Sequence, residues 1–379
     1  MKSKALRNKK IALLAAMCTV GSLVGCAGNG DQAVNNGTQV TFNYQVTEEG
    51  VHFKMPNAPI TPAWKPNELL EANLDEVALY NKSSIPLKAR ILKDRLSSVN
   101  STQKLDTEIV ALSIMNSSTS GNIPHGTNQF EANTFSYWQY IDKLVPPTPD
   151  VTDSAHKNGV PVLGTIFFPP VEYGGKTEWV DDFLQRDESG KFIIIDKLVE
   201  TCDRLGFDGW FINQETQLDE ASQKKVEYAT LFQDFLKQFK EATNGKYEIM
   251  WYDAMTVDGE MDWQNQMNDK NKAFVIDAEG NELADSMFLN FWWTTDKLAP
   301  EELLKKSNEY AQSVGYNPKK LFAGIDMQAN GTGTPIKWNL LENGDDPLVS
   351  IGLYCPSWSF FSAEDINQFH EKESRIYVN

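Results

Sequence analysis

The strongest constraint on the fold is a regular alternation of short apolar runs with amphipathic stretches from residue 108 to the end of the chain. Such alternation is typical of parallel strands joined by helical crossovers, because each crossover buries one apolar face against the sheet. The apolar runs predict eight strands, at 108–115, 135–141, 160–168, 207–213, 247–253, 286–293, 321–328 and 349–355. Helical patterns occupy 149–158, 193–205, 219–243, 300–314 and 362–373. We therefore expect an α/β fold, a (β/α)8 TIM barrel.

The competing architecture is a doubly wound open sheet, which also alternates strands with helices. Its nucleotide-binding forms carry a glycine-rich phosphate loop after the first strand, and no such loop follows residues 108–115. The expected strands are also nearly continuously apolar, as strands buried on both faces are. These two observations favour the barrel.

The N-terminal residues predict export. Basic residues precede an apolar run from Ile11 to Val24, which is typical of a signal peptide over residues 1–25. The run ends in Leu-Val-Gly-Cys, which resembles a bacterial lipobox and predicts lipidation of Cys26; the alternative is an ordinary cleaved signal with a chance cysteine. We expect a flexible tether over 26–45, a lead-in segment over 46–107 and a catalytic barrel over 108–379. The expected location is the extracellular face of a bacterial membrane, with the lipid as anchor.

Composition excludes several function classes. The chain carries 52 acidic and 35 basic residues, a formal net charge of −17, which disfavours nucleic acid as a partner. Outside the N-terminal segment the cysteines are Cys202 and Cys355, which we interpret as small buried apolar residues. The four histidines do not have metal-ligand spacing, so neither a metal nor an organic cofactor is expected.

Polar and aromatic residues gather where the expected strands end. In a parallel barrel the carboxyl ends of the strands form the active site, so these residues are candidates for one site. An aromatic rim suits the apolar faces of sugar rings, whereas the alternative is that these rings only cap the barrel core. The candidates are Phe167, Phe168, Asn213, Glu215, Trp251, Tyr252, Asp253, Trp292, Trp293 and Asp326.

The segment GFDGWFINQET places one amide and one carboxyl group on the same face of a strand end, as Asn213 and Glu215. Most glycosidases use two carboxylates, one as general acid and one as nucleophile or base. An amide cannot take either role, but it can orient a 2-acetamido group on the substrate, whose own carbonyl oxygen then attacks the anomeric carbon. Glu215 would act as general acid and base. The alternative is a polar strand end that caps the following helix.

A general acid must be protonated before it reacts, so the pKa of Glu215 should be raised. We expect burial among Trp210, Tyr252 and Trp263 to raise it.

Seven segments together resemble glycoside hydrolase family 85, the endo-β-N-acetylglucosaminidases that act on N-glycan cores. They occur in the order of the family, and the FDGWFINQE stretch is highly specific. The segments are 135–145, 152–169, 206–216, 250–266, 288–293, 322–331 and 352–358.

The resemblance implies hydrolysis of the GlcNAc-β1,4-GlcNAc bond by substrate-assisted retaining catalysis through an oxazoline, with some transglycosylation. It implies that Asn213 orients the acetamide, that Glu215 is the general acid and base, and that Tyr252 hydrogen-bonds near the acetamide. N-linked glycans of glycoproteins are the implied partners. The expected substrate-binding residues are Trp263, Trp292, Trp293, Phe168, Asp253, Asn116 and Asp326.

The chain departs from the family pattern in three places. The first strand ends in 115–123 without the usual His-Asp segment, and the seventh ends in Ala-Asn-Gly at 329–331 without the usual arginine. We also expect the β-sandwich domains that follow the barrel in the family to be absent from this chain. Two other function classes share the aromatic strand ends. They are a lipid-anchored glycan-binding protein without catalysis, which needs no buried acid, and a chitinase-like hydrolase, which would have Asp at position 213.

Overall fold

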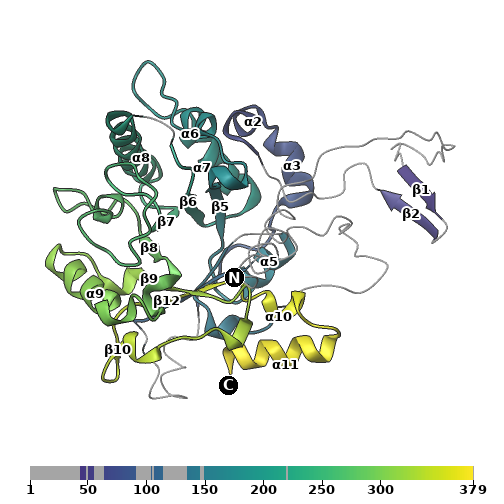
Figure 1. Cartoon of the computed structure of the whole chain (residues 1–379). Helices are drawn as coiled ribbons and strands as arrows, with labels where there is room; N and C mark the ends of the chain where they lie inside the picture. Colours follow the sequence, from purple (N-terminus) through teal and green to yellow (C-terminus); the bar gives the residue numbers. More distant parts are fainter. Residues whose placement is uncertain are drawn as a thin grey trace, which may run out of the picture.

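The computed structural model describes residues 43–47, 50–54, 64–90, 104, 106–113, 135–145, 149–218 and 221–378. Within these ranges, eight parallel strands form a barrel with helices around it (Figure 1). The barrel strands are β3 (Ile109–Leu112), β4 (Lys143–Val145), β5 (Leu163–Phe168), β6 (Gly209–Gln214), β7 (Glu248–Tyr252), β8 (Ser286–Leu289), β9 (Leu321–Asp326) and β12 (Ser350–Tyr354).

The strands pair side by side in the order β4-β3-β12-β9-β8-β7-β6-β5, and every pair is parallel. The two ends of this sheet meet through a single parallel bridge between Leu144 and Val162. The Leu144 N–H also donates to the Pro161 carbonyl oxygen at 3.1 Å. The sheet is thus a nearly closed TIM barrel, and the expected fold class is confirmed.

Helices lie between the strands, as the apolar periodicity predicts. The longest is α8 (Ser222–Thr243), whose Phe232, Phe235 and Phe239 are fully buried against the sheet. The others between or after the barrel strands are α5 (Pro149–Lys157), α6 (Thr177–Phe183), α7 (Ile194–Leu205), α9 (Leu303–Ser313), the short α10 (Trp358–Phe361) and α11 (Ile366–Tyr377). A two-residue ribbon, β10 (Glu342–Asn343) with β11 (Asp346–Pro347), precedes β12.

Buried apolar side chains lie both inside the barrel and between its strands and the surrounding helices. The interior is filled by side chains of alternate strand positions, including Phe211, Met250, Phe288 and Phe322. A larger layer fills the space between the strands and the surrounding helices. The interior leaves no room for a side chain at position 352, because a Cβ on Gly352 would lie 2.2 Å from a ring carbon of Phe288.

One expected strand is wrong. Residues 135–141 do not pair with the sheet; they contain the 3-10 helix η2 (Trp138–Tyr140), and the second barrel strand is β4, which follows. The aromatic residues of this stretch instead pack against α11. Phe135 lies edge-on to Trp138 at 4.6 Å and to Tyr377 at 5.3 Å between ring centroids. A run rich in aromatic residues looks the same in the sequence whether it packs on a helix or joins a sheet.

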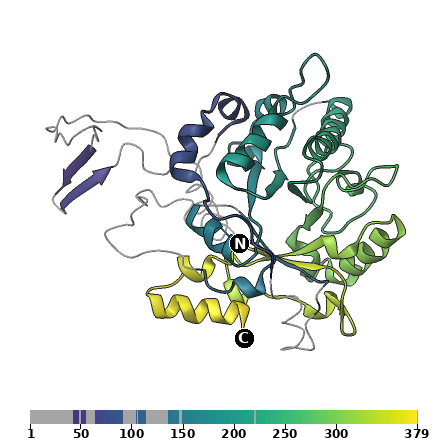
Figure 2. The ribbon, with the colours of Figure 1, turned by 180° about the vertical axis from the view of Figure 1, so that it is seen from behind.

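The lead-in segment contributes two helices to the barrel. Helices α2 (Pro66–Glu71) and α3 (Leu74–Asn81) lie against α6 and α7, as both ribbon views show (Figures 1 and 2). A hairpin of β1 (Asn43–Thr47) and β2 (Gly50–Lys54) precedes them. Strand β1 begins inside the stretch expected to be a tether. The signal sequence and Cys26 lie outside the described residues.

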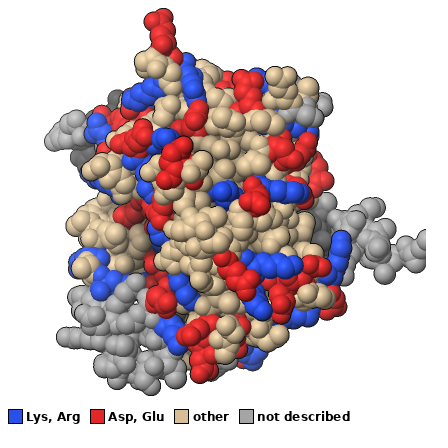
Figure 3. All heavy atoms as spheres, turned by 90° about the vertical axis from the view of Figure 1, so that its left-hand side faces the viewer, with Lys and Arg blue, Asp and Glu red and all other residues tan. Residues whose placement is uncertain are grey.

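Charge is mixed rather than segregated on the face that lies on the left in Figure 1. Figure 3 shows acidic and basic residues interspersed with uncharged ones over that face. Opposite charges also form ion pairs among the described residues, such as Lys225 with Glu260 at 3.1 Å and Lys240 with Asp285 at 2.6 Å. The described residues of this face thus present no extended basic surface of the kind that binds nucleic acid.

A buried histidine ties the lead-in segment to the barrel. His156 of α5 is 3% exposed, and its Nδ1 lies 2.6 Å from the Ile85 carbonyl oxygen. Its Nε2 lies 2.8 Å from Oδ2 of Asp208, which also accepts from the Val162 N–H. Both ring nitrogens face acceptors, which suits a doubly protonated ring. Burial alone lowers the pKa of His156, but the bonds to Asp208 and Ile85 outweigh it and raise the pKa overall.

We predict that His156→Ala lowers the free energy of unfolding by about 2 kcal/mol at pH 6, because hydrogen bonds to charged groups are lost. Since the pKa is higher in the folded state, the contribution is complete below about pH 6.5 and is lost as the pH rises through the folded pKa. Urea unfolding of the full chain between pH 5.5 and 9 measures this. The exposed His370→Ala is the matched control. A difference from wild type that stays constant with pH would contradict the assignment.

Candidate active site

Alternate residues of a strand face the same side of the sheet, and we call this odd or even position the parity of a residue. Parity decides which side chains reach the mouth formed by the carboxyl ends of the strands. On β6, Phe211 packs in the barrel interior, so Asn213 points to the same side. Trp210 has the opposite parity and lies outside the barrel against Phe207, with 5.6 Å between ring centroids. The expected contact of Trp210 with Glu215 is therefore wrong, because adjacent strand residues face opposite sides.

Asn213 and Glu215 form a directly hydrogen-bonded pair. Asn213 Nδ2 donates to Oε1 of Glu215 at 2.7 Å. The Glu215 N–H donates to the Phe168 carbonyl oxygen at 2.9 Å, which extends the ladder between β5 and β6 beyond the strand. Behind the pair, the Thr216 N–H donates to Gln214 Oε1, and Gln214 Nε2 donates to the Thr216 carbonyl oxygen, at 3.2 and 3.0 Å. These bonds fix the backbone that presents Glu215 to the mouth.

The surroundings of Glu215 favour its protonated form. Burial raises the pKa of Glu215 above its ordinary value, and the hydrogen bond from Asn213 only partly offsets this. Tyr252, Tyr354 and Tyr173 lie around the same carboxyl group. Burial is the main cause of the raised pKa of each tyrosine, and the negative charge of Glu215 raises it further. The site therefore has the electrostatics of a carboxylic acid that is ready to donate a proton.

Tyr252 lies near this pair and bonds to the residue that follows β8. It is 5% exposed, at the end of β7, and its hydroxyl donates to Oδ1 of Asn290 at 3.0 Å. Trp263 packs against the interior cluster that contains Tyr252. Trp251 has the opposite parity and stacks on Phe274 outside the barrel, with 4.7 Å between ring centroids. As expected, Tyr252 faces the mouth and Trp251 serves packing.

Two amide groups at the mouth have unused hydrogen-bonding atoms. Asn213 Oδ1 and Asn290 Nδ2 are buried, and neither has a partner among the described residues. Buried polar atoms in folded proteins usually have a partner, so such atoms at a mouth are available to a ligand. One is an acceptor and the other a donor, which matches the two polar atoms of an amide on a substrate.

Aromatic side chains line the rim. Trp292 of η5 (Phe291–Thr294) is 49% exposed, and its ring lies 5.8 Å from that of Trp263, with an angle of 59°. On the β5 side, Phe167 and Tyr173 are exposed, the latter in η3 (Val171–Tyr173). Exposed rings around a buried acid give the mouth surfaces on which apolar faces of a ligand can stack.

Two of the predicted aromatic contacts are wrong. Phe168 is 3% exposed and packs behind the sheet against Phe183 and Phe232, at 5.2 and 6.0 Å between ring centroids. Trp293 is 1% exposed, and its Nε1 donates to the Gly324 carbonyl oxygen at 2.8 Å. In the pairs Phe167-Phe168 and Trp292-Trp293 the first residue reaches the mouth and the second packs toward the helices, whereas in Trp251-Tyr252 the second residue reaches the mouth.

Asp253 is buried and turned away from the mouth, so its predicted contact with substrate is also wrong. It is 1% exposed and accepts from the backbone N–H groups of Gln264 and Asn265 at 3.3 and 2.6 Å. It also accepts from Nδ2 of Asn271 at 2.8 Å. Burial raises its pKa to about 7, against these hydrogen bonds, which lower it. Its acceptor atoms are used to hold the loop that follows β7.

Two predicted substrate-binding residues remain, Asp326 and Asn116. Asp326 ends β9, pairs in register with Tyr354 and is half-buried. Burial raises its pKa, and its Oδ1 accepts from the Gln328 N–H at 2.9 Å. It has the parity of the interior residue Phe322, so it faces the mouth. Asn116 lies outside the described residues.

Sequence reasoning named Phe167, the register partner of Asn213, but missed three other residues of the mouth. The missed residues are Tyr173, Asn290 and Tyr354. Strand alternation gives a signal for two of them, since Asn290 follows the interior residue Phe288 by two positions and Tyr354 is the register partner of Asp326. Tyr173 lies beyond the end of β5, in η3, where strand alternation gives no signal.

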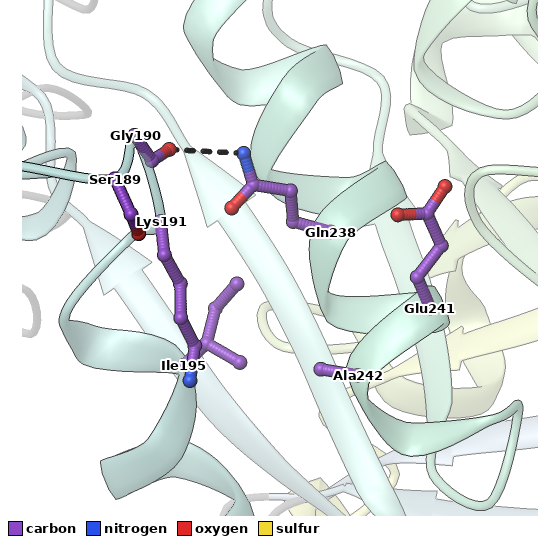
Figure 4. A pocket seen from close by; sticks show the side chains of 7 residues that line it. All are labelled: Ser189, Gly190, Lys191, Ile195, Gln238, Glu241 and Ala242. Carbon is purple, nitrogen blue, oxygen red and sulfur yellow. Dashed lines mark hydrogen bonds between the residues drawn. The ribbon is translucent and has the colours of Figure 1, made fainter. Parts of the chain in front are cut away.

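A separate pocket lies on the outer surface. It is formed by residues 189–191, Ile195 and three residues of α8, namely Gln238, Glu241 and Ala242 (Figure 4). Gln238 Nε2 donates to the Gly190 carbonyl oxygen across it at 3.2 Å. No residue of the barrel mouth lines it, and its polar atoms come from residues of α8 and of the segment 189–191. The mouth remains the candidate active site.

Within the described ranges, no group of three or more His, Cys, Asp or Glu side chains is placed to hold a metal ion. None of the described helices is long and apolar enough to span a lipid bilayer.

Known proteins resemble this chain in sequence. It is 28% identical over 320 residues to a Danio rerio protein named cytosolic endo-beta-N-acetylglucosaminidase, covering 81% of this chain and 40% of that protein. It is 29% identical over 255 residues to cytosolic endo-beta-N-acetylglucosaminidase 2 of Arabidopsis thaliana, covering 64% of this chain and 31% of that protein. The chain thus spans less than half the length of these relatives.

The names of the relatives overturn one prediction. The matching proteins of Danio rerio, Arabidopsis thaliana, Mus musculus and Homo sapiens are all named cytosolic. This contradicts the expected location on the extracellular face of a membrane. That expectation rested on the first 26 residues, whose structure is not described.

A solved structure resembles this chain in fold. The glycoside hydrolase domain of Endo-D from Streptococcus pneumoniae R6 superimposes with a TM-score of 0.71 and 29% identity, covering 84% of this chain and 50% of that chain. In sequence, residues 115–379 match the profile of glycosyl hydrolase family 85. This match includes every strand of the barrel except β3, together with Asn213, Glu215 and Tyr252. The chain belongs to glycosyl hydrolase family 85.

Proposed function

We propose that this protein is an endo-β-N-acetylglucosaminidase that hydrolyses the GlcNAc-β1,4-GlcNAc bond of N-glycan cores. The observation that carries the proposal is the hydrogen-bonded pair of Asn213 and Glu215 at the barrel mouth, in which burial raises the pKa of the single carboxyl group. Family membership and the names of the relatives support the same activity. N-linked glycans of glycoproteins are the proposed partners.

The proposed reaction is substrate-assisted. Glu215 donates its proton to the glycosidic oxygen while the acetamide carbonyl oxygen of the substrate attacks the anomeric carbon, so that the glycosidic bond breaks and a protonated oxazoline (an oxazolinium ion) forms. The Glu215 carboxylate then takes a proton from water as the water oxygen attacks the same carbon and opens the oxazoline. Two displacements retain the configuration, with the acetamide in the place of a carboxylate nucleophile.

Asn213 has the geometry for orienting the acetamide. Its Nδ2 is used by Glu215, while its Oδ1 is buried and has no partner in the described part of the chain. An acetamide N–H donating to Oδ1 would hold the carbonyl oxygen toward the anomeric carbon and stabilise the charge that develops on the amide. Tyr252 donates a hydrogen bond to Asn290, and the charge of Glu215 contributes to its raised pKa. Tyr252 is proposed to hydrogen-bond near the substrate acetamide, on the same side as Asn213.

The exposed rings at the rim are proposed to bind the sugars of the glycan. Trp263 and Trp292 form one platform, and Phe167 and Tyr173 lie on the side of β5. Because the oxazoline is an activated donor, a sugar hydroxyl that enters this rim in place of water would give transglycosylation.

A second mechanism would use Asp326 as the partner carboxylate of Glu215. Asp326 faces the mouth, but burial raises its pKa, and the hydrogen bond from the Gln328 N–H offsets this only in part. A nucleophile must be ionised, so these features favour the substrate acetamide in that role. A binding protein without catalysis would have no use for a buried acid at the end of β6.

We predict that Glu215→Gln lowers hydrolysis by about 10³-fold or more, because a general acid and base is removed without a change of shape. Mass spectrometry of high-mannose and paucimannose glycoproteins measures this as peptides that keep a single GlcNAc. Asp326→Asn is the matched control and should cost less than about tenfold. Equal losses in both variants would point to the two-carboxylate mechanism, and full activity of Glu215→Gln would reject the proposal.

We predict that Asn213→Ala lowers hydrolysis of natural glycans by about 10²-fold, the usual effect of removing one oriented donor or acceptor at the transition state. A synthetic oxazoline donor already contains the ring that Asn213 helps to form, so its transfer to an acceptor should fall by less than about tenfold. Chromatography of both reactions on the same enzyme preparation gives the comparison. A parallel loss in the two reactions would refute the orienting role.

We predict that kcat/KM falls on the alkaline side with an apparent pKa above 4.5, the ordinary value for Glu, because burial raises the pKa of Glu215 and the protonated form is required. Initial rates on a fluorescent glycopeptide between pH 4 and 9 give the profile. A midpoint at or below 4.5 would show that Glu215 is not the acid that limits the rate.

A further inference from the structure

We propose that Asn265 is a positioning residue that sets the two rim tryptophans, Trp263 and Trp292, at their working separation. The inference rests on the proposed function only in that these rings bind glycan. Asn265 is 2% exposed and does not reach the mouth itself. It lies in the loop between β7 and β8, and it acts through the two backbones that carry the tryptophans.

The side chain of Asn265 bonds to both tryptophan backbones. Its Nδ2 donates to the Trp263 carbonyl oxygen at 2.9 Å, and its Oδ1 accepts from the Trp292 N–H at 2.8 Å. Trp263 belongs to the loop after β7, whereas Trp292 belongs to η5 after β8. One buried amide therefore joins two connections of the barrel at the point where their rings meet, 5.8 Å apart.

The backbone conformation of Asn265 is specialised for this role. Its φ is 57°, in the left-handed region that costs most residues energy and that asparagine tolerates. In this conformation the backbone N–H points to Oδ2 of Asp253 at 2.6 Å while the side chain reaches η5. Energetically costly conformations of this kind persist where surrounding contacts impose them.

The buried carboxyl group of Asp253 supports the loop that carries Asn265. This carboxylate accepts from Gln264, Asn265 and Asn271, and the backbone N–H of Asn290 also lies against it. Asn290 in turn accepts from the Tyr252 hydroxyl. The same carboxylate thus holds the rim loop and lies beside the residue that bonds to Tyr252.

A purely structural role for Asn265 predicts a different result from a positioning role. If Asn265 only stabilised its loop, its removal would lower the unfolding temperature, and its effect on glycan affinity would not depend on Trp292. If Asn265 acts by placing Trp292, its removal should have little further effect once the Trp292 ring is gone. Coupling between two substitutions is the measure that separates these cases.

The test measures binding of a high-mannose glycopeptide by calorimetry in the full chain carrying Glu215→Gln, so that no turnover occurs. Asn265→Gly removes the side chain and tolerates the positive φ. We expect it to raise Kd by about tenfold, and by less than about threefold in a Trp292→Ala background. Asn244→Gly is the matched control, because Asn244 is also left-handed, with φ of 48°, but ends α8. It should leave Kd within about twofold.

A second variant covers the case in which Asn265→Gly does not fold. Asn265→Asp tolerates the same φ and keeps the acceptor for the Trp292 N–H but loses the donor to Trp263. It should raise Kd by less than Asn265→Gly does. An unchanged Kd in Asn265→Gly, an equal effect in the Trp292→Ala background, or no glycopeptide binding by the parent protein would each overturn the inference. Binding without cleavage by the wild-type chain would instead reject the endoglycosidase activity and leave the inference standing.

Discussion

The parity of the parallel strands is the constraint on which the rest of the structure depends. Once the sheet closes through the bridge between Leu144 and Val162, each strand has one face in the barrel and one under the helices. Side chains alternate between these faces, so a shift of one residue exchanges core for mouth. Asn213 and Glu215 share the mouth because they stand two apart, and Gln214 between them is fully buried behind them.

The chemistry of the mouth follows from the low polarity of its surroundings. Burial raises the pKa of Glu215, and three tyrosines lie around the same carboxyl group. An amide beside that acid can orient a substrate group without adding a second negative charge. A second carboxylate at position 213 would compete for the same proton and change the protonation of the pair. The pairing of one acid with one amide at the end of β6 therefore favours a substrate that brings its own nucleophile.

The rim depends on contacts between chain segments that are distant from the acid in sequence. Asp253 holds the loop after β7, and Asn265 joins that loop to η5. The tryptophan pair is thus supported by buried polar groups that do not reach the mouth. Such support is sensitive to small changes, because each buried carboxylate or amide loses a bonded partner when a neighbour is altered.

The sequence by itself determined the barrel, most of its strands and helices, and the residues of the acid–amide pair, because apolar periodicity and alternation are local properties of the chain. The tertiary structure decided which member of each aromatic pair faces the mouth, that Asp253 holds a loop, and that residues 135–141 pack on α11. These outcomes depend on where strands begin and on partners far along the chain, including the helix at the C-terminal end. Burial and partner identity are properties of the assembled fold, and no local pattern specifies them.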